Sequence, residues 1–277
     1  MTTDALSLTI NTDLARKILV NFLQTEIQRS GFSRAVVGVS GGVDSSLACL
    51  LAADALGPDN VLALRMPYKT SSSESIVHAG EIIEMAGVHE KTIPITGMVD
   101  ALDEFIPETD RIRRGNVMAR ARMLVLYDQS AEFNALVVGT GNKTEIILGY
   151  TTHYGDAACA LNPIGDLYKT QVLQLAAAMG VPQTIISKPP SADLWVGQTD
   201  EQELGFTYAE VDRLLIRMID GRFSIEDCVD SGFEKEFVEQ VYERIRRNHY
   251  KHVPPIIAKV SNRTVGHDFL YLRDWGT

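Results

Sequence analysis

Short apolar runs and longer stretches of helical periodicity alternate along the first half of the chain. An apolar run bounded by glycine, proline or polar residues is typical of a strand that is buried on both faces, as in a parallel sheet. Such runs predict strands at residues 34–39, 60–66, 90–95 and 135–138, and apolar positions spaced by three or four predict helices at 13–29, 45–56, 73–86, 99–105 and 111–133. Strands that alternate with helices favour the α/β class: a doubly wound, mostly parallel sheet with helices on both faces.

The second half of the chain is predicted to be mainly helical. Helical spacing recurs at residues 144–148, 169–179, 208–220, 224–229 and 234–249. Residues 188–205 break the pattern, because they combine prolines, glycines and acidic residues without periodicity. A long segment without regular structure inside a compact domain is usually functional, often as a lid. Since no repeat, linker or low-complexity tract divides the chain, we expect one domain over residues 1–277.

Composition argues against several classes of protein. The 277 residues carry a net charge of −10 with a pI of about 5.1, which argues against nonspecific nucleic-acid binding. No apolar run reaches the roughly 18 residues that cross a membrane, and the N-terminus lacks the basic and apolar parts of a signal peptide. Three cysteines without a CxxC pair indicate neither a disulfide framework nor a cysteine zinc site. A reducing cytoplasm is therefore the expected location.

The glycine-rich loop at residues 38–45, GVSGGVDS, is the strongest chemical signal. It follows a predicted strand and precedes a predicted helix, so its backbone N–H groups and the helix N-terminus can bind an anion. It is not a Walker A loop, because the lysine of GxxxxGK[ST] is absent. Asp44 would repel a phosphate unless a divalent cation lay between them, which indicates Mg²⁺. The simpler alternative is that Asp44 only favours the start of the helix.

Further candidates follow the other predicted strands, because ligands of a doubly wound sheet bind beyond the carboxyl ends of its strands. Glu145 could supply a second Mg²⁺ contact or be a surface residue. Asp156 could orient a nucleophile, bind metal or simply occupy a turn. Lys169 begins a helix, where the dipole disfavours a cation unless an anion such as phosphate is bound. The segments expected to converge are 38–45, 65–67, 95–96 and 139–140.

Two basic groups are candidates for binding a phosphorylated substrate. Arg120 and Arg122 are two positions apart on the long predicted helix, so they face different directions. One of them can face a substrate phosphate while the other is solvated or ion-paired. Tyr250 and Lys251 follow the last long helix and are a second candidate, unless they only provide the positive charge that favours a helix C-terminus. The histidines form no HxxxH or HExxH pattern, which argues against a zinc site.

The motif SGGVDS resembles the pyrophosphate-binding loop of the N-type ATP pyrophosphatases, which cleave ATP between its α- and β-phosphates and adenylate a substrate. Several families share that loop, but the rest of the chain resembles one of them, the ammonia-dependent NAD synthetases, with their adenine nucleotide alpha hydrolase-like fold. The resemblance covers nearly the whole chain. It rests on GVSGGVDSS (38–46), RMPY (65–68), RGNVMARARM (114–123), GTGNKTE (139–145), YGD (154–156), NPIGDLYKTQV (162–172), KPPSADLWVGQTDEQELGFTY (188–208) and RTVGHDFLYLRDWG (263–276).

The resemblance implies a reaction in two steps. ATP adenylates the nicotinate carboxylate of deamido-NAD and releases pyrophosphate, and ammonia then attacks the acyl-adenylate to give NAD and AMP. The resemblance also implies Mg²⁺ as cofactor and a homodimer with the dinucleotide near the subunit interface. Mg²⁺ suits this reaction because it neutralises the charge of the transition state and of the departing pyrophosphate. A closed lid would keep water away from the adenylate.

By position, the resemblance also implies roles for individual residues. The Mg²⁺ ligands fall on Asp44 and Glu145, and Asp44, Lys169 and Asp156 are the catalytic residues, with Asp156 assisting the attack of ammonia. The ATP-binding residues are Gly38, Val39, Ser40, Gly41, Gly42, Val43, Asp44, Ser45, Arg65, Thr140, Lys169 and Ser191, and the deamido-NAD-binding residues are Arg120, His153, Tyr250 and Lys251. The chain departs from the usual pattern in the dinucleotide site, where His153 replaces a lysine, Ala160 an aspartate and Tyr250 a histidine.

The nitrogen source is inferred from the length of the chain. Glutamine-dependent relatives carry a separate glutaminase domain with a cysteine nucleophile, and after one domain of this size no residues remain for a second. We therefore expect free ammonia, or ammonia from a separate donor protein. Two alternatives remain: another adenylating N-type pyrophosphatase, acting on a tRNA base or XMP, and a non-catalytic nucleotide sensor on the same fold. Release of pyrophosphate would distinguish an enzyme from a sensor.

Overall fold

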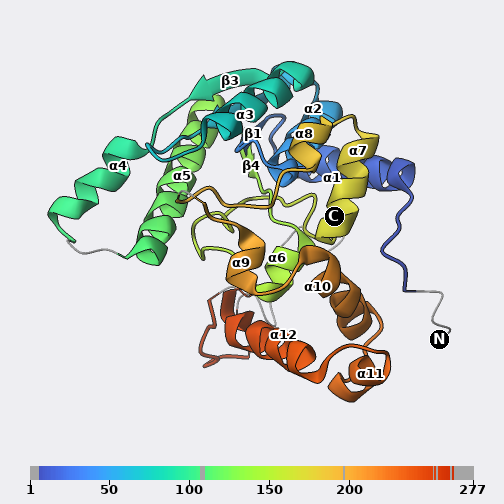
Figure 1. Ribbon diagram of the computed structural model, residues 1–277. Coiled ribbons are helices and arrows are strands. Elements are labelled where there is room, and N and C mark those ends of the chain that lie inside the picture. The colour runs from blue at the N-terminus through green and yellow to red at the C-terminus, as the bar shows by residue number, and fades with distance from the viewer. Residues whose placement is uncertain are drawn as a thin grey trace.

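A four-stranded parallel sheet organises the first half of the molecule (Figure 1). This computed structural model describes residues 6–106, 110–195, 197–251, 253, 255–262 and 264. The strands are β1 (Ala35–Gly38), β2 (Val61–Arg65), β3 (His89–Thr92) and β4 (Leu136–Val138), in the order β3-β2-β1-β4. Ala35 pairs in parallel register with Val61 on one side and with Leu136 on the other. The strand order reverses beside β1, so a ligand crevice is expected at its carboxyl end.

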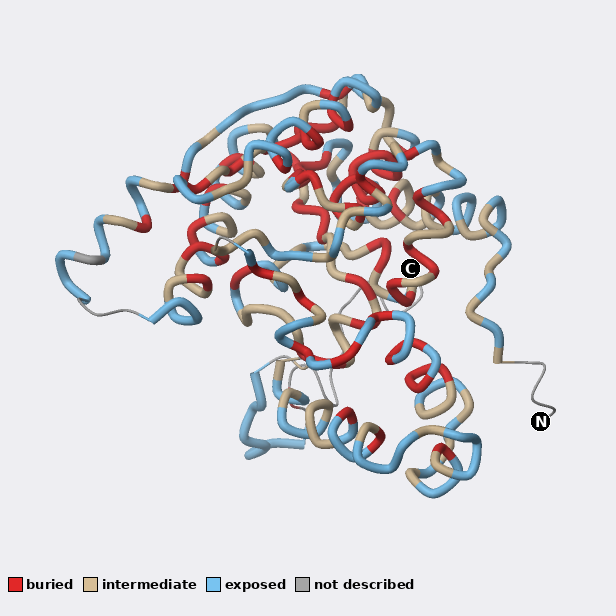
Figure 2. The backbone as a smooth tube through the Cα atoms, in the orientation of Figure 1, coloured by how far each residue is buried: buried red, intermediate tan, exposed pale blue. Residues whose placement is uncertain are grey.

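Helices cover both faces of the sheet. Alternate residues of a strand point to opposite faces, and Val37 and Ala63 belong to one hydrophobic cluster whereas Val36 and Leu64 belong to another. Buried residues gather around the sheet in Figure 2. The doubly wound α/β class is therefore confirmed. The first cluster is covered by α1 (Thr12–Arg29), α2 (Val43–Leu56), α3 (Ser73–Ala86), α7 (Lys169–Ala178) and α8 (Gln183–Ile186), and the second by α4 (Thr96–Asp100) and α5 (Arg111–Phe133).

Two elements differ from the predicted ones. β3 is shorter than the strand expected at 90–95 and ends at Thr92, opposite the last residue of β2, Arg65, although the N–H groups of Ile93 and Ile95 still donate to the carbonyls of Arg65 and Pro67. The helix expected at 99–105 is instead α4 followed by the 3₁₀ turn η3 (Ala101–Glu104), since the N–H of Val99 bonds to the carbonyl of Ile95 and starts the helix earlier. A further 3₁₀ turn, η2 (Pro58–Asn60), precedes β2.

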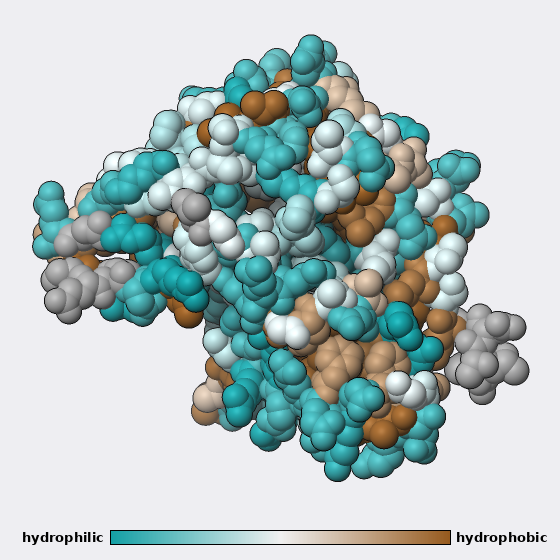
Figure 3. Space-filling model, in the orientation of Figure 1, coloured by the Kyte–Doolittle hydropathy of each residue, from teal (hydrophilic) through white to brown (hydrophobic). Residues whose placement is uncertain are grey.

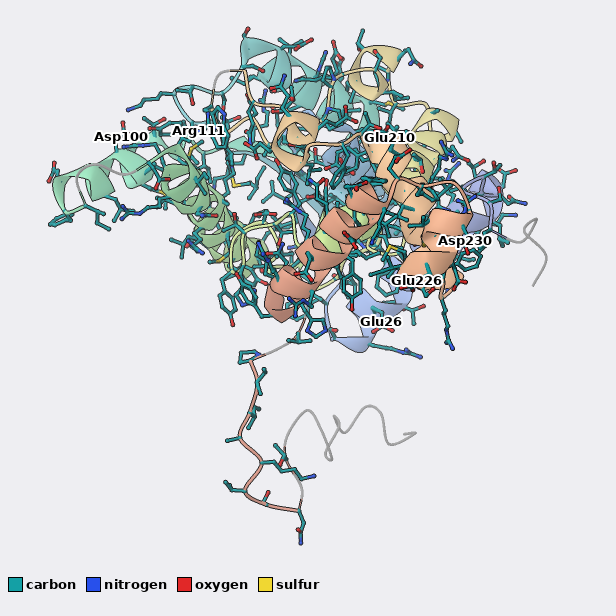
Figure 4. The ribbon with its side chains drawn as sticks, turned by 60° about the horizontal axis from the view of Figure 1, so that its bottom comes forward. Glu26, Asp100, Arg111, Glu210, Glu226 and Asp230 are labelled. Carbon is teal, nitrogen blue, oxygen red and sulfur yellow. The ribbon has the colours of Figure 1, made fainter. Side chains whose placement is uncertain are left out.

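A second, helical layer lies below the sheet in Figure 1. Tyr208, Val211 and Val241 belong to its separate hydrophobic core. Figure 4 shows its helix α11, marked by Glu226 and Asp230, on the opposite side of the molecule from the labelled Asp100. The elements of this layer are α6 (Lys143–Leu148), α9 (Asp200–Leu204), α10 (Tyr208–Leu215), the π-helical turn η4 (Ile216–Asp220), α11 (Ile225–Asp230), α12 (Lys235–Asn248) and the 3₁₀ turn η5 (His249–Lys251).

The segment at residues 188–205, expected to lack regular structure, ends in a helix. Its described residues before Asp200 form turns and irregular backbone, but α9 occupies 200–204. The motif at 263–276, apart from Thr264, lies outside the described residues. Among the helices that the structure describes, none is long and apolar enough to cross a membrane.

Candidate functional site

A cavity of about 1070 Å³ opens at the carboxyl ends of the strands. The glycine-rich loop, residues 65–67 and residues 139–140 line it, as predicted. β3 contributes Thr92 rather than residues 95–96, because Ile95 is fully buried in the core. Every residue that was expected to bind ATP lines this cavity except Gly41. The volume is in the range of cavities that hold nucleotide-sized ligands.

The glycine-rich loop is shaped by its own serines and by close contact with α3. The Ser45 hydroxyl donates to the carbonyl of Gly42 at 3.0 Å and accepts from the N–H of Ser40 at 3.1 Å. Gly41 has φ = +81°, and a Cβ at this position would lie 2.2 Å from the carbonyl oxygen of Ser75. Gly41 therefore allows the loop to pass next to α3. No side chain caps the first N–H groups of α2, so these donors remain for an anion.

The centre of the site is an ion pair between residues 125 positions apart. The Lys169 ammonium, at the start of α7, donates to Oδ2 of Asp44 and lies 4.0 Å from Oε1 of Glu145. The Asn142 amide donates to Oδ1 of Asp44 at 2.9 Å, and its backbone N–H donates to Oε2 of Glu145 at 3.1 Å. Asp44 therefore provides the anionic partner that Lys169 needs at a helix N-terminus.

Burial and mutual repulsion control the charges of this group. Burial, reinforced by the charge of Asp44, raises the pKa of Glu145 to about 8. Burial alone would lower the pKa of Lys169, but attraction to Asp44 and Glu145 outweighs it and the net change is upward. Lys169 is only 3% exposed. The ammonium is therefore charged and pairs with the Asp44 carboxylate, whereas Glu145, with its raised pKa, keeps its proton at neutral pH.

The donor set of this group fits Mg²⁺ bound together with a nucleotide. Mg²⁺ is usually held by one or two carboxylates plus substrate phosphate oxygens and water, and not by an all-protein cage. Asp44 and Glu145 supply two such carboxylates from the starts of α2 and α6. Within the described ranges there is no cluster of three acidic, histidine or cysteine side chains that could hold a metal alone. The residues present therefore match a cation that phosphate helps to bind.

A buried network next to Lys169 was not predicted from the sequence. The Tyr150 hydroxyl donates to Oδ1 of Asp200 at 3.1 Å and to Oε2 of Glu203 at 2.8 Å, while the Tyr208 hydroxyl donates to Oδ2 of Asp200 at 3.3 Å. The Tyr208 ring centre lies 5.2 Å from the Lys169 ammonium, within cation–π range. Burial raises the pKa of Asp200. The acidic run at 200–203 was the only sequence signal, and it did not reveal the tyrosine partners.

Asp156 and the segment over the cavity lie where they were expected. Oδ1 of Asp156 accepts from the N–H of Thr152 at 2.8 Å, and burial raises the pKa of this carboxyl. The segment is tied to α3, since Lys188 donates to the Ser75 hydroxyl at 2.9 Å and Oδ2 of Asp193 accepts from the N–H of Ser72 at 3.0 Å. Asp156, Ser191 and residues 187–195 all line the cavity. The segment thus has the position of a lid.

The residues expected to bind deamido-NAD form a group at the rim. Lys251 lines the cavity and donates to the carbonyls of Gly149 and Thr151, at 2.7 and 2.9 Å. Arg120 donates to the backbone carbonyl of His153 at 3.3 Å, and the rings of His153 and Tyr250 are 6.2 Å apart. These last three residues do not line the main cavity. Arg120 instead borders a smaller cavity of about 180 Å³ between the α4 region and α5.

The three cysteines have the environment of structural residues. Cys49 is fully buried in α2, and burial raises the pKa of its thiol to about 12. Burial also raises the pKa of Cys159 and Cys228. A thiol with a raised pKa is a poor nucleophile at neutral pH.

Known proteins provide independent comparisons. The sequence profile of the family described as NAD synthase matches residues 15–255. The chain is 57% identical over 269 residues to an NH(3)-dependent NAD(+) synthetase of Trichlorobacter lovleyi, covering 97% of this chain and 98% of the relative. Two solved structures are also similar: an NMN synthetase from Francisella tularensis (33% identity, TM-score 0.80, 90% of this chain and 99% of that one) and an NH3-dependent NAD synthetase from Campylobacter jejuni (31% identity, TM-score 0.78, 90% and 100%). The expected resemblance and an enzyme of the ligase class are thereby confirmed. The chain belongs to the NAD synthase family.

Proposed function

We propose that this enzyme amidates deamido-NAD to NAD with ammonia and ATP, through an acyl-adenylate, and releases pyrophosphate and AMP. The observation that carries the proposal is the group of Asp44, Lys169 and Glu145 beside the glycine-rich loop. It combines a buried cation with oxygen ligands for a metal next to an anion-binding loop. Cleavage between the α- and β-phosphates of ATP requires such a combination, because the departing pyrophosphate is highly charged.

In the first step, a carboxylate oxygen of the substrate attacks the α-phosphorus, and the bond from that phosphorus to the pyrophosphate oxygen breaks. The N–H groups of the glycine-rich loop bind the departing pyrophosphate. With ATP bound, Lys169 would exchange Asp44 for a phosphate oxygen, and the side chains of Asp44 and Glu145 would hold Mg²⁺ once Glu145 has lost its proton. When bound, Mg²⁺ neutralises part of the charge on the phosphate oxygens.

In the second step, ammonia forms the C–N bond at the acyl carbon and AMP leaves with the electron pair of the broken C–O bond. The attacking nitrogen must then lose a proton. Asp156 lines the cavity, and its raised pKa makes it a stronger base than an ordinary aspartate. Residues 188–195 cover the cavity and would limit hydrolysis of the adenylate by water.

We assign the remaining half of the dinucleotide to the rim residues Arg120, His153, Tyr250 and Lys251, and expect a homodimer. Hydrophilic residues dominate the face shown in Figure 3, so large exposed apolar side chains are notable. On α5, Leu124 is 57% exposed and Tyr127 41%, and three positions apart they lie on one face of the helix, which supports a subunit interface there. Leu124→Asp should convert the dimer to monomers in analytical ultracentrifugation, and a wild-type monomer would contradict the assignment.

The mononucleotide of nicotinic acid is a second candidate substrate. The relative from Francisella tularensis is named as an NMN synthetase, and it shares the fold at 33% identity. Both substrates present the same nicotinate carboxylate to ATP, so the glycine-rich loop would act alike on each. The rim is the part that would distinguish them, since only the dinucleotide extends so far.

The decisive experiment is formation of the amide from deamido-NAD or nicotinate mononucleotide, with ATP, Mg²⁺ and either ammonium or glutamine. We expect NAD from deamido-NAD with ammonium alone. Product only from the mononucleotide would favour the second candidate. Pyrophosphate release with another acid, but with neither of these, would favour a different adenylating enzyme, and ATP binding without pyrophosphate would indicate a sensor. A separate ammonia donor and a cytoplasmic location stay predictions.

A further inference from the structure

Helix α5 brings a second arginine to the main cavity. Arg120 and Arg122 are two positions apart, about 200° around the helix, and only Arg122 lines the main cavity. α5 covers one face of the sheet and α7, which carries Lys169, packs on the other. Arg122 and Lys169 therefore reach the same cavity from opposite faces of the sheet. The two arginines that the sequence could not distinguish have different environments.

One hydrogen bond orients the Arg122 guanidinium. Its Nε donates to the backbone carbonyl of Met66 at 3.1 Å, directly after the end of β2. The Met66 side chain in turn lies beside Gly38, since a Cβ on that glycine would be 3.1 Å from the Met66 methyl carbon. Arg122 is thus anchored next to the first residue of the glycine-rich loop. Its terminal nitrogens make no other hydrogen bond in the part of the chain that the structure describes.

In the described part of the chain, Arg122 lacks the ion pair that three other cations lining the cavity make. Lys169 pairs with Asp44, Arg65 with Glu90 at 3.1 Å and Lys188 with Glu74 at 3.7 Å. The remaining lining cations have other partners, since Arg111 and Arg244 lie over aromatic rings and Lys251 donates to two carbonyls. Arg122 has no carboxylate within ion-pair distance among the described residues. Burial lowers its pKa, and attraction from Asp193 and Asp156 at longer range offsets this only partly. A buried cation without an ion-pair partner is energetically unfavourable unless a bound anion compensates its charge.

We propose that Arg122 binds the α-phosphate of ATP and stabilises the charge that develops there as the adenylate forms. This inference rests on the proposed function. The glycine-rich loop and Lys169 take the pyrophosphate side, whereas Arg122 lies at the adjoining strand end, in the same cavity as Asp156, the residue assigned to ammonia attack. The group between these two sides is the α-phosphate. The planar guanidinium can donate two parallel hydrogen bonds to it, which a lysine cannot do.

The test separates a phosphate contact from a structural role. Isothermal titration with AMP and with adenosine measures the preference for the phosphate. Wild-type protein should bind AMP more tightly, and Arg122→Gln should lose that preference while it keeps its affinity for adenosine. In Arg122→Gln, the rate at which labelled pyrophosphate exchanges into ATP in the presence of substrate should fall by about 10²- to 10³-fold relative to wild type, as when one oxyanion donor is removed. Arg122→Lys should recover only part of the rate, because lysine retains the positive charge but cannot donate two parallel hydrogen bonds to the phosphate.

Arg16→Gln is the matched control, because Arg16 is an exposed arginine of α1 paired with Asp54. It should leave both measurements unchanged. If wild-type protein shows no exchange, the proposed function fails. If wild-type exchanges and Arg122→Gln and Arg122→Lys do so at the same maximal rate, or if AMP and adenosine lose affinity equally, the role of Arg122 is overturned. If Arg122→Gln does not fold, Arg122→Lys is tested in its place by the same titrations and the same exchange assay.

Discussion

The two ends of the cavity are built in different ways. At the glycine-rich loop, Asp44 is bonded to Lys169 and Asn142, and Glu145 is bonded to the same asparagine. At the rim, Arg120 and Tyr250 are exposed. Arg120 donates a hydrogen bond to the backbone carbonyl of His153, and the ring of Tyr250 lies 6.2 Å from the His153 ring. Buried and fully bonded groups hold a single geometry, whereas exposed side chains must be ordered by what binds them. The nucleotide end is therefore organised before binding, and the rim is not.

Removal of the buried cation is the strongest test of this difference. Lys169→Met leaves Asp44 without its counter-charge, and we expect the free energy of unfolding to fall by about 3 kcal/mol, the scale for breaking a buried pair. The double variant Lys169→Met/Asp44→Asn should recover much of the loss, because it removes both charges. Urea unfolding of wild-type protein, Lys169→Met, Asp44→Asn and the double variant measures the coupling energy between Lys169 and Asp44. Independent, additive effects would contradict an organised ion pair.

Binding of the metal gives the next largest effect. Because Lys169 already occupies the carboxylates, Mg²⁺ alone should raise the melting temperature of wild-type protein little. Mg²⁺ and a non-hydrolysable ATP analogue should each strengthen the binding of the other, by about 5- to 150-fold on the usual scale of coupling. In Lys169→Met, Mg²⁺ should stabilise the protein without nucleotide. Lys143→Met, whose lysine pairs with Asp166 and Asp220 away from the main cavity, is the control and should behave as wild type.

The dependence of stability on pH tests the charge of Glu145. Its pKa is about 8 in the folded protein, above the ordinary 4.5 of an exposed glutamate. The folded state therefore keeps a proton that the unfolded state has lost, and the free energy of unfolding falls as pH rises through this window, by at most about 1.4 kcal/mol per pH unit. Glu145→Gln has no such proton, so its stability relative to wild type should rise from about pH 5 to about pH 8 in urea unfolding. A difference that does not vary with pH would show that Glu145 titrates normally.

The rim should give the smallest effects. Arg120→Gln removes an exposed charge, and we expect KM for deamido-NAD to rise about fivefold or less, since exposed ionic contacts contribute about 1 kcal/mol at most. KM for ATP should not change. Steady-state kinetics with each substrate varied in turn measures both. A large loss in kcat would mean that the rim is organised as tightly as the nucleotide end.

Much of the nucleotide end was predictable because it is encoded locally. The glycine-rich loop, the capping glutamate at 145 and the lysine at the start of α7 each have a signal within a few residues. The rim offered only basic residues that had equally simple alternatives, and the acidic run at 200–203 did not reveal its tyrosine partners. Periodicity showed that Arg120 and Arg122 face apart, but it could not show which of them faces the cavity, because that depends on how α5 is rotated against the sheet.

The α/β class, the order of strands and helices along the chain, and an anion-binding loop with an acidic residue in it were all predictable from the amino-acid order. These follow from hydrophobic periodicity and from the turn chemistry of glycine, which act over short distances. The packed molecule was needed to show that Lys169 pairs with Asp44 across 125 positions, that the hydroxyls of Tyr150 and Tyr208 bond to Asp200, and that Arg122 lines the cavity. Such pairs depend on how distant elements pack, because burial and charge act between neighbours in space and not along the chain.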